Sequence, residues 1–538
     1  MPSALRRSAL AACLLALAAP HTGLAQSRDR RTIVLAVPQQ ASVPIPTMME
    51  GAASTTGNQD VADQLFLRLA VLGPALQTSG DDGFVPQLAR SWTRRDSLTL
   101  AFDLDPRARW HDGSPVVAAD VVLAFDRARN PAIAPKLAGL LRHVAAVTAE
   151  SDRRVVIRFD RAYAEQLYDA TFHVQPLPSH LLASARAAPE LPREFVQHPV
   201  GNGPFKWVRS VPGQFIELAA DTAFFLGRPG IGRVFIRAAS DPDARLNLML
   251  SGEADATDVS APVSNFQRVA AAPDLRTASV PSPVMGYLLF NQRDRTDRSR
   301  PHPILSDPVV RRAIVLALDR VMMVRATYGA YADVPYGPVS QLLWIRRGSP
   351  RAARQNLGEA RRLLASRGWT DSDGDGVLDR DGRPLALTLN YPLTSEVRRQ
   401  MATLAQEQLR QAGIRIDLVR LEGPVWSERR SRGAFDIDFS SVTQDPTPSG
   451  LTQGWTCHGG TNVGGYCDPA VDSLMERAIA ARSGADRLWQ EVLRRIEADA
   501  PAAFLYAPSY VFAVNRRVAT VRLRPESAWR DLWQWSVR

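Results

Sequence analysis

The sequence contains very little lysine, and its basic residues are not gathered into a patch. Only Lys136 and Lys206 are lysines among 65 basic residues in the 538-residue chain, and the arginines are interleaved along its whole length with 55 acidic residues. A nucleic-acid-binding protein concentrates arginine and lysine on one face, with aromatic residues between them. The net charge of +10 therefore reflects composition, and we expect no nucleic-acid partner.

Long apolar runs are also missing. The one strongly apolar, uncharged stretch, residues 8–20, is shorter than the roughly 20 residues that a membrane-spanning helix needs. Yet 45% of all residues are hydrophobic, a fraction that excludes a wholly disordered chain. At roughly 150 residues per domain, the length suits about three domains. We expect an ordered protein of several domains.

The sequence lacks the common motifs of catalysis and of nucleotide or metal binding. It contains no G-x-x-x-x-G-K-[ST] loop, no H-E-x-x-H pair and no G-x-S-x-G turn, and its 8 histidines are scattered. We therefore expect a binding protein and not an enzyme, with no catalytic residue, no cofactor and no metal site.

One acidic loop is similar to a calcium-binding loop but departs from it near the end. Asp371, Asp373 and Asp375 alternate with other residues, as the ligands do in such loops. The last ligand position, which would carry a bidentate acid, is Gly382. We expect a surface turn over residues 371–379 that needs no metal, and calcium binding is the alternative.

The N-terminal residues have the parts of a secretory signal peptide. Arg6 and Arg7 precede an apolar stretch at residues 9–19, and small residues at 23 and 25 stand before Gln26. We expect residues 1–25 to be removed and the mature chain to be periplasmic. A lipid anchor at Cys13 is the alternative, although it would cut the apolar stretch below its usual length of about 7 residues.

Cysteine is scarce, and export determines how it is used. Of the three cysteines, Cys13 would be lost with the signal peptide, which leaves Cys457 and Cys467 around a glycine-rich segment. In an oxidising compartment such a pair favours a disulfide. The alternative is a metal site formed by both cysteines and His458.

The pattern of apolar residues changes along the chain. Short strand patterns occupy the first half, at residues 32–37, 98–104, 155–159, 215–218 and 234–236, and no long helical period precedes residue 300. In the second half, helices are predicted after Asp307, from Thr394 to Gly413 and after Asp468, with a strand following Gly413. This alternation indicates an α/β lobe with a substantially parallel sheet, and a change of composition at residues 281–300 is expected to divide the chain.

A series of short motifs carries a family resemblance. It includes Leu-Ala-Arg-Ser-Trp at 88–92, Trp-His-Asp-Gly-Ser-Pro at 110–115, Val-Gly-Asn-Gly-Pro-Phe at 200–205, and Asp-Pro-Val-Val-Arg-Arg-Ala-Ile at 307–314. In this order the motifs resemble the large extracytoplasmic solute-binding proteins of ABC importers, the peptide/nickel-binding family 5. The resemblance covers essentially the whole mature chain.

The resemblance implies an α/β fold of two lobes, joined by a hinge, that close around a buried ligand. The segment 110–115 would be scaffold and not a ligand site. The division that it implies is a signal peptide at 1–25, a lobe I core at 26–75 with 200–285 and 510–538, an extra lobe I subdomain at 76–199, and lobe II at 286–509.

The same resemblance implies four candidate ligand contacts. Peptide-binding members commonly hold the amino terminus of the ligand with an Asp ahead of the cysteine-flanked loop, where this chain has Asp445 in a shortened segment. The alternative role of Asp445 is to cap the turn before the next proline. Trp455 is expected to floor the pocket or to pack under the lobe surface. Asn202, where the family usually has Thr, and Gly203 are expected near the cleft.

We therefore expect a monomeric receptor that captures short peptides and delivers them to a membrane permease. A nickel chelate, an oligosaccharide or another small solute is the alternative ligand. An exported hydrolase is a remote alternative of a different class, because the sequence shows no nucleophile paired with a base.

Overall fold

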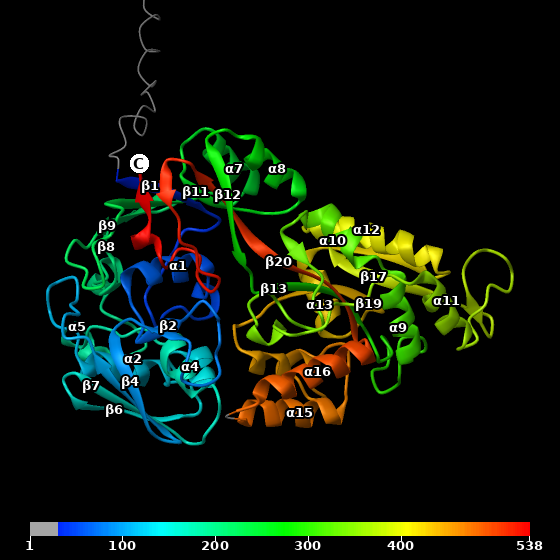
Figure 1. The fold of residues 1–538 in the computed structure, drawn as a ribbon, viewed down its shortest axis with the longest axis horizontal. Coiled ribbons are helices and arrows are strands. Elements are labelled where there is room, and N and C mark those ends of the chain that lie inside the picture. The colour runs from blue at the N-terminus through cyan, green and yellow to red at the C-terminus, as the bar shows by residue number, and fades with distance from the viewer. Residues whose placement is uncertain (1–30, 482) are drawn as a thin grey trace, which may run out of the picture.

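The computed structural model describes residues 31–481 and 483–538, which form two lobes (Figure 1). The predicted signal peptide, with Cys13 and Gln26, lies outside these residues. Among the helices described, none combines the length and the apolar character that a membrane span requires.

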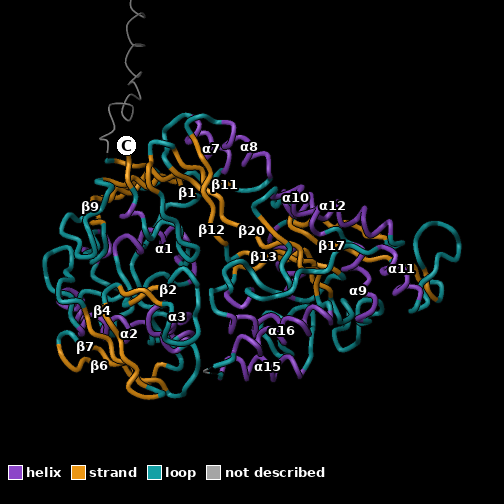
Figure 2. The backbone as a smooth tube through the Cα atoms, viewed as in Figure 1, coloured by secondary structure: helices purple, strands orange, loops and turns teal. Residues whose placement is uncertain are grey.

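A twelve-stranded mixed sheet runs through both lobes (Figure 2). Its order is β18 (Arg415–Leu421), β17 (Ala386–Pro392), β19 (Ile437–Thr443), β13 (Val284–Phe290), β20 (Ala502–Asn515), β11 (Ala256–Val259), β1 (Thr32–Val37), β10 (Arg233–Ala238), β9 (Phe215–Ala220) and β8 (Phe205–Val211). Two further strands, β12 (Leu275–Pro281) and β14 (Ala332–Asp333), also pair with β20. We call the part around β1 and β8–β12 lobe I, and the part around β13 and β17–β19 lobe II.

β20 belongs to both lobes. Its first part pairs with β13 of lobe II, and its last part, from Ser509 to Asn515, pairs with β12 and β11 of lobe I. Only residues 282–283 separate β12 from β13, so the chain passes between the lobes there and again along β20. We propose these two passages as the hinge, and the boundaries given above stay a prediction.

The expectation of a substantially parallel sheet is correct for three strands of lobe II. β17 is parallel to β18 and to β19, with α12 (Glu396–Gln411) and α13 (Gly423–Ser431) in the connections. It is wrong for β13 and β20, which run antiparallel to their neighbours. These two strands connect directly to the other lobe, so no crossover helix sets their direction.

Lobe II covers both faces of its sheet with helices. Leu288 and Phe290 of β13 belong to one core, and Met285, Tyr287 and Leu289 belong to the other. Successive side chains of a strand point to opposite faces, so the unbroken apolar sequence of β13 is what two covered faces require. The first core lies under α9 (Pro308–Ala317), α10 (Arg320–Tyr328), α11 (Leu357–Ala365) and α12, and the second under α14 (Thr452–Trp455), α15 (Pro469–Ala480) and α16 (Ala485–Asp499).

The helix starts predicted in lobe II are confirmed. Asp307 and Asp468 cap α9 and α15, and each carboxylate accepts a hydrogen bond of 2.9 Å from the backbone N–H two residues on. α12 begins two residues after Thr394, because Ser395 is its N-cap. Gly413, at φ +80°, follows its last turn, where a left-handed residue ends a helix.

Lobe I has a second layer outside the main sheet. An antiparallel sheet of β4 (Ala89–Asp96), β5 (Thr99–Leu104), β7 (Arg154–Phe159) and β6 (Val144–Ser151) lies beside α2 (Ala118–Ala128). Trp110 is buried there, and its Nε1 donates a hydrogen bond of 2.9 Å to Asp120 of α2, as a scaffold residue would. The buried residues of this layer and of the lobe I main sheet form one apolar cluster, so the extra subdomain shares its core with the rest of lobe I.

The remaining helices and strands are short. Several lie before residue 300, where the sequence pattern indicated no long helix, because each spans ten residues or fewer. They are α1 (Thr56–Leu65), α3 (Pro135–Leu140), α4 (Gln166–Phe172), α5 (Ser179–Leu182), α6 (Arg193–Gln197), α7 (Pro242–Leu250), α8 (Val263–Ala271), β2 (Ala70–Leu72), β3 (Phe84–Pro86), β15 (Asp379–Arg380), β16 (Arg383–Pro384), β21 (Val518–Thr520) and β22 (Ser536–Val537).

Candidate functional site

A cavity of about 760 Å³ lies between the two lobes. Lobe I contributes α1, α8 and residues 258–261 at the end of β11 to the wall of the cavity. Lobe II contributes Tyr328 and residues 443–446 at the end of β19, and β20 crosses the cavity at residues 508–512. Small-molecule sites typically enclose about 300–1,000 Å³. Because both lobes bound the cavity, a ligand there would contact both, and we take it as the candidate ligand site.

Asp445 is the predicted site residue that lies in the cavity wall. The side chain of its neighbour Gln444 fixes this segment by accepting a hydrogen bond of 2.7 Å from Ser340 N. The Asp445 side chain is exposed, and no hydrogen bond to its carboxylate occurs within the described residues. Thr447 caps the turn instead, since its hydroxyl accepts a hydrogen bond from Ser449 N at 3.2 Å. No hydrogen bond within the described residues supports the turn-capping alternative for Asp445, and its contact with a ligand stays a prediction.

Trp455 is not part of the cavity wall. It is 5% exposed and packs against Tyr287 and Phe504 in lobe II, with ring centroids 5.6 and 5.4 Å away. This position corresponds to the packing alternative. A direct contact between Trp455 and a ligand stays a prediction that the position does not favour.

Asn202 and Gly203 also lie outside the wall, where they join the start of β8 to the end of α1. Asn202 Oδ1 accepts a hydrogen bond of 2.8 Å from Leu67 N, and Gly203 N donates one of 2.8 Å to Leu65 O. A Cβ atom on residue 203 would lie 2.3 Å from the carbonyl oxygen of Gln64, so the position has room only for glycine. Both residues hold α1, which carries part of the wall, and their contact with a ligand stays a prediction.

A buried ion-pair network lies on the lobe I side of the cavity. Asp63 binds Arg68 at 2.6 Å and Arg530 at 3.3 Å, and Arg530 also binds Glu526 at 2.9 Å. Burial alone would raise the pKa of Asp63, but the two arginines outweigh it and lower that pKa to about 2. The charges of Arg68 and Arg530 are therefore compensated by carboxylates of the protein itself.

Sequence reasoning missed Asp60, Asp258 and Tyr510, which lie in the cavity wall. Burial raises the pKa of Asp60 well above its usual range, and repulsion from Asp63 and Asp258 raises it further. The pKa of Tyr510 is raised by burial and then by the charges of Asp60 and Asp258. The three residues come from α1, β11 and β20, so no local stretch of sequence indicates that they meet.

The lobes also meet at a contact that does not involve β20. Glu165 of lobe I accepts hydrogen bonds from Thr78 Oγ1, at 2.8 Å, and from Thr447 Oγ1 of lobe II. Trp344 of lobe II donates from Nε1 to Thr78 Oγ1 at 3.1 Å. Burial raises the pKa of Glu165. This contact holds the lobes against each other in the structure described here.

The predicted disulfide is confirmed. Cys457 and Cys467 are bonded, with Cα atoms 4.2 Å apart, so the alternative of a metal site formed by two thiolates and His458 is wrong. A second hollow of about 800 Å³ opens beside the disulfide and is lined by residues of lobe II alone. A ligand in that hollow would not bridge the lobes.

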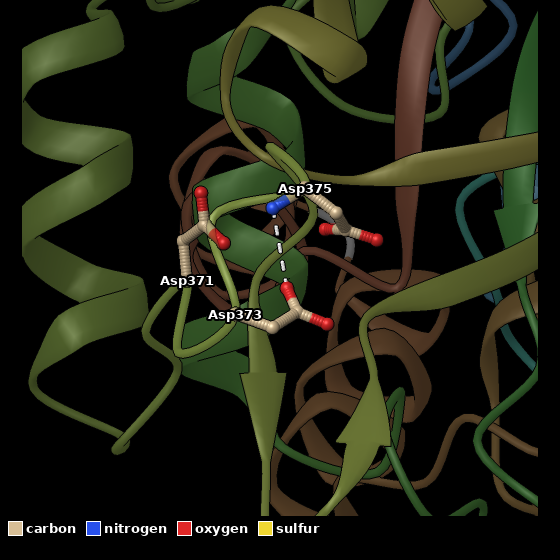
Figure 3. Close-up of side chains that lie close together, drawn as sticks. All are labelled: Asp371, Asp373 and Asp375. Atoms are coloured by element: carbon tan, nitrogen blue, oxygen red, sulfur yellow. Dashed lines mark hydrogen bonds between the residues drawn. The ribbon is translucent and has the colours of Figure 1, made fainter.

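The acidic loop turns at the surface, as predicted: residues 371–376 are exposed, residues 377–379 are half-buried, and β15 begins at Asp379. Asp371 accepts hydrogen bonds from Gly374 N and Gly376 N, at 2.8 and 3.1 Å, and Asp373 accepts one from Asp375 N at 3.2 Å (Figure 3). Oxygen atoms of the three carboxylates lie within 4.8 Å of one another. Such hydrogen bonds are those by which Asp residues stabilise turns, and the expectation that the loop needs no metal stays a prediction.

Comparison with known proteins agrees with the two-lobed architecture. The family model of the bacterial extracellular solute-binding proteins, family 5 (middle), matches residues 83–464. The oligopeptide-binding protein AppA of Bacillus subtilis is 25% identical over 445 residues, which cover 81% of this chain and 80% of AppA. The structure of AppA in complex with a nonapeptide has a TM-score of 0.69 at 22% identity, covering 94% of this chain and 99% of AppA.

Two further solved structures share the fold. The ABC transporter substrate-binding protein CtaP of Listeria monocytogenes has a TM-score of 0.80 at 20% identity, covering 94% of this chain and 99% of CtaP. NikZ from Campylobacter jejuni, in complex with Ni(L-His), has a TM-score of 0.71 at 20% identity, covering 95% of this chain and 100% of NikZ. Because the family match extends over well more than half of the chain, the protein belongs to family 5 of the bacterial extracellular solute-binding proteins.

Proposed function

We propose that the protein is the solute receptor of an ABC importer, which captures short peptides between its lobes and delivers them to a membrane permease. The observation that carries this proposal is the cavity bounded by both lobes, with the carboxylate of Asp445 in its wall. AppA, which is related over four-fifths of the chain, is an oligopeptide-binding protein. The cavity volume of about 760 Å³ favours a ligand of a few residues over a nonapeptide.

Closure of the lobes provides the mechanism of capture. A peptide that touches both walls binds the closed arrangement more tightly than an open one, and it shifts the population toward closure. An enclosed ammonium group without a counter-charge is costly, and Asp445 supplies that charge for the amino terminus. No step requires chemistry on the ligand, and incubation with a peptide mixture should leave every peptide uncleaved.

The test is a pair of matched peptides, one with a free amino terminus and one N-acetylated, titrated against the wild type and Asp445→Asn. The substitution should weaken binding of the free-amine peptide by about 2–5 kcal/mol, because it leaves the ammonium unpaired in the closed cavity. Binding of the acetylated peptide should change little. Equal losses for both peptides in calorimetry would contradict the proposed role of Asp445.

The cavity wall favours a peptide over the alternative ligands. NikZ holds a nickel chelate, but its likeness to this chain extends to the fold alone. Arg68 and Arg530, the arginines of the wall, are already paired with Asp63. A sugar site needs several exposed aromatic platforms, whereas Tyr510, at 38%, is the one exposed aromatic side chain among the wall residues, and Phe512 and Trp529 are 3% and 4% exposed.

A further inference from the structure

The basic side chains of the cavity wall have little charge to offer a ligand. Arg68 and Arg530 bind Asp63 at 2.6 and 3.3 Å, and Arg530 also binds Glu526 at 2.9 Å. Lys136, the third base of the wall, is exposed and lies at the start of α3. Most of the positive charge in the wall is thus neutralised before a ligand enters.

The acidic side chains of the wall are not neutralised to the same extent. Glu50 accepts hydrogen bonds of 3.2 Å from two backbone N–H groups at the start of α3, and Glu526 belongs to the ion-pair network. Asp258 binds Arg245 at 3.2 Å. For the carboxylates of Asp60 and Asp445, the described residues provide no hydrogen bond and no ion pair. The wall therefore presents an excess of negative charge to the cavity.

Asp60 and Asp258 form the part of this excess that lies on lobe I. Both residues line the cavity, Asp60 from α1 and Asp258 from β11. The charge of Asp258 adds to the larger effect of burial in raising the pKa of Asp60, which the charge of Arg530 opposes. Neighbouring carboxylates in a low-dielectric wall are unfavourable until a cation joins them. Tyr510 also lines the cavity and is 38% exposed. Asp258 of β11 pairs with Phe512 of β20, so Tyr510, two residues from Phe512, faces the same side of the sheet as Asp258. An exposed aromatic ring attracts a cation to its face.

We propose that Asp60, Asp258 and Tyr510 form a second subsite, on lobe I, that binds a positively charged side chain of the ligand. This inference rests on the proposed function, because it takes the ligand to be a peptide. With Asp445 on lobe II, the subsite selects peptides that carry a lysine or arginine in addition to their amino terminus. Since the two acidic positions belong to different lobes, a ligand with two positive charges attracts both walls of the cavity.

Four tripeptides test the subsite: Ala-Lys-Ala, Ala-Ala-Lys and the counterparts with norleucine in place of lysine. Norleucine keeps the apolar chain of lysine and removes its ammonium group. In calorimetry, the better-bound lysine peptide should bind the wild type about tenfold more tightly than its norleucine counterpart, because close pairs of opposite charge at interfaces can couple by about 1.5 kcal/mol or more and tenfold corresponds to about 1.4 kcal/mol. Asp60→Asn should reduce this preference to about threefold or less, and Asp258→Asn should reduce it in the same direction.

Asp60→Asn is the decisive variant, because Asn has the shape of Asp and the Asp60 carboxylate makes no hydrogen bond that folding would lose. Asp243→Asn is the matched control: it removes the same charge from α7, where Asp243 is 71% exposed and binds Arg268 outside the cavity. The control should keep the full lysine preference.

Each other outcome overturns a defined part of the inference. Equal binding of lysine and norleucine peptides by the wild type overturns the second subsite and leaves the peptide receptor in place. A full lysine preference in Asp60→Asn also overturns the second subsite and leaves the peptide receptor in place. If none of the four peptides binds the folded wild type, the proposed function fails together with the subsite.

Discussion

Asp438 shows how a single buried charge makes the stability of this protein depend on pH. It lies on β19, where its carboxylate accepts hydrogen bonds from Trp426 Nε1 at 2.8 Å and from Ser440 Oγ at 2.5 Å. Burial raises its pKa from 3.8 to about 6, although these hydrogen bonds and the nearby Arg430 oppose the rise. The folded protein therefore holds a proton in a pH range where the unfolded chain has released it.

The contribution of Asp438 to stability should fall as the pH rises from about 4 to about 6, because the unfolded state binds fewer protons than the folded state in that range. A rise of the pKa from 3.8 to about 6 corresponds to about 3 kcal/mol. Asp438→Asn removes this dependence. The free energy of unfolding of the variant, measured in urea relative to that of the wild type, should therefore increase by up to about 3 kcal/mol from pH 4 to pH 7. If the variant and the wild type differed in free energy of unfolding by the same amount at pH 4 and at pH 7, the raised pKa of Asp438 would be contradicted.

Single residues also show what the sequence could predict of the site. Asp445 could be predicted from the sequence because it lies close to the loop between Cys457 and Cys467, which a family resemblance can locate. Asp60 and Asp258 could not be predicted, because neither has a motif around it and their positions in one wall depend on how α1 packs against β11 and β20. Trp455 is buried under lobe II by its contacts with Tyr287 and Phe504, which no local pattern indicates.

At the scale of helices and strands, prediction succeeded where the signal is local. The Asp-Pro pairs at residues 307–308 and 468–469 set the starts of α9 and α15, because the Asp caps the helix and the Pro fits its first turn. The direction of β13 and β20 has no local signal, since it follows from pairing between segments about 200 residues apart in sequence. This is why the sheet is less parallel than the sequence indicated.

The junction between β8 and α1 can be tested at Gly203. In Gly203→Ala the added methyl would meet the carbonyl oxygen of Gln64 at 2.3 Å, so the variant should lose about 1–3 kcal/mol of unfolding free energy. Gly139→Ala in α3 is the matched control, because a Cβ there meets nothing within 4 Å and Ala favours a helix by up to about 1 kcal/mol. Urea midpoints measure both. If Gly203→Ala lost no more unfolding free energy than Gly139→Ala changes, the junction between β8 and α1 would be able to adjust to the added methyl group.

At the scale of the whole molecule, two different connections hold the lobes. One is covalent and continuous, through β20 and residues 282–283, and it keeps the lobes attached whether they are open or closed. The other is the contact of Glu165 and Thr78 with Thr447 and Trp344, which exists only while the lobes are together. The second connection therefore favours closure even without a ligand.

Thr447→Val tests that contact, because it keeps the shape of the side chain and removes the hydroxyl that donates to Glu165, together with the cap that the same hydroxyl gives to Ser449 N. One hydrogen bond contributes about 0.5–1.5 kcal/mol, so peptide affinity should fall up to about tenfold. The radius of gyration of the ligand-free protein should rise in X-ray scattering. Thr456→Val is the control, since its hydroxyl binds Thr452 O at 2.7 Å within lobe II. Identical scattering and affinity in the two variants would show that the contact does not favour closure.

The path of β20 also sets the order in which the molecule is assembled as it is made. Lobe II uses residues from β13 to the first part of β20, so it is complete once the chain has been extended past Pro508. Lobe I begins at β1 but needs β20 beside β11, and its core includes Trp529, Leu532 and Trp535 near the end of the chain. Domains fold as units, usually the N-terminal one first during synthesis. Here the order is reversed: β1 and β8–β10 can pair early, but the lobe that starts the chain is the last to finish, because β20 and the C-terminal apolar residues join it only at the end.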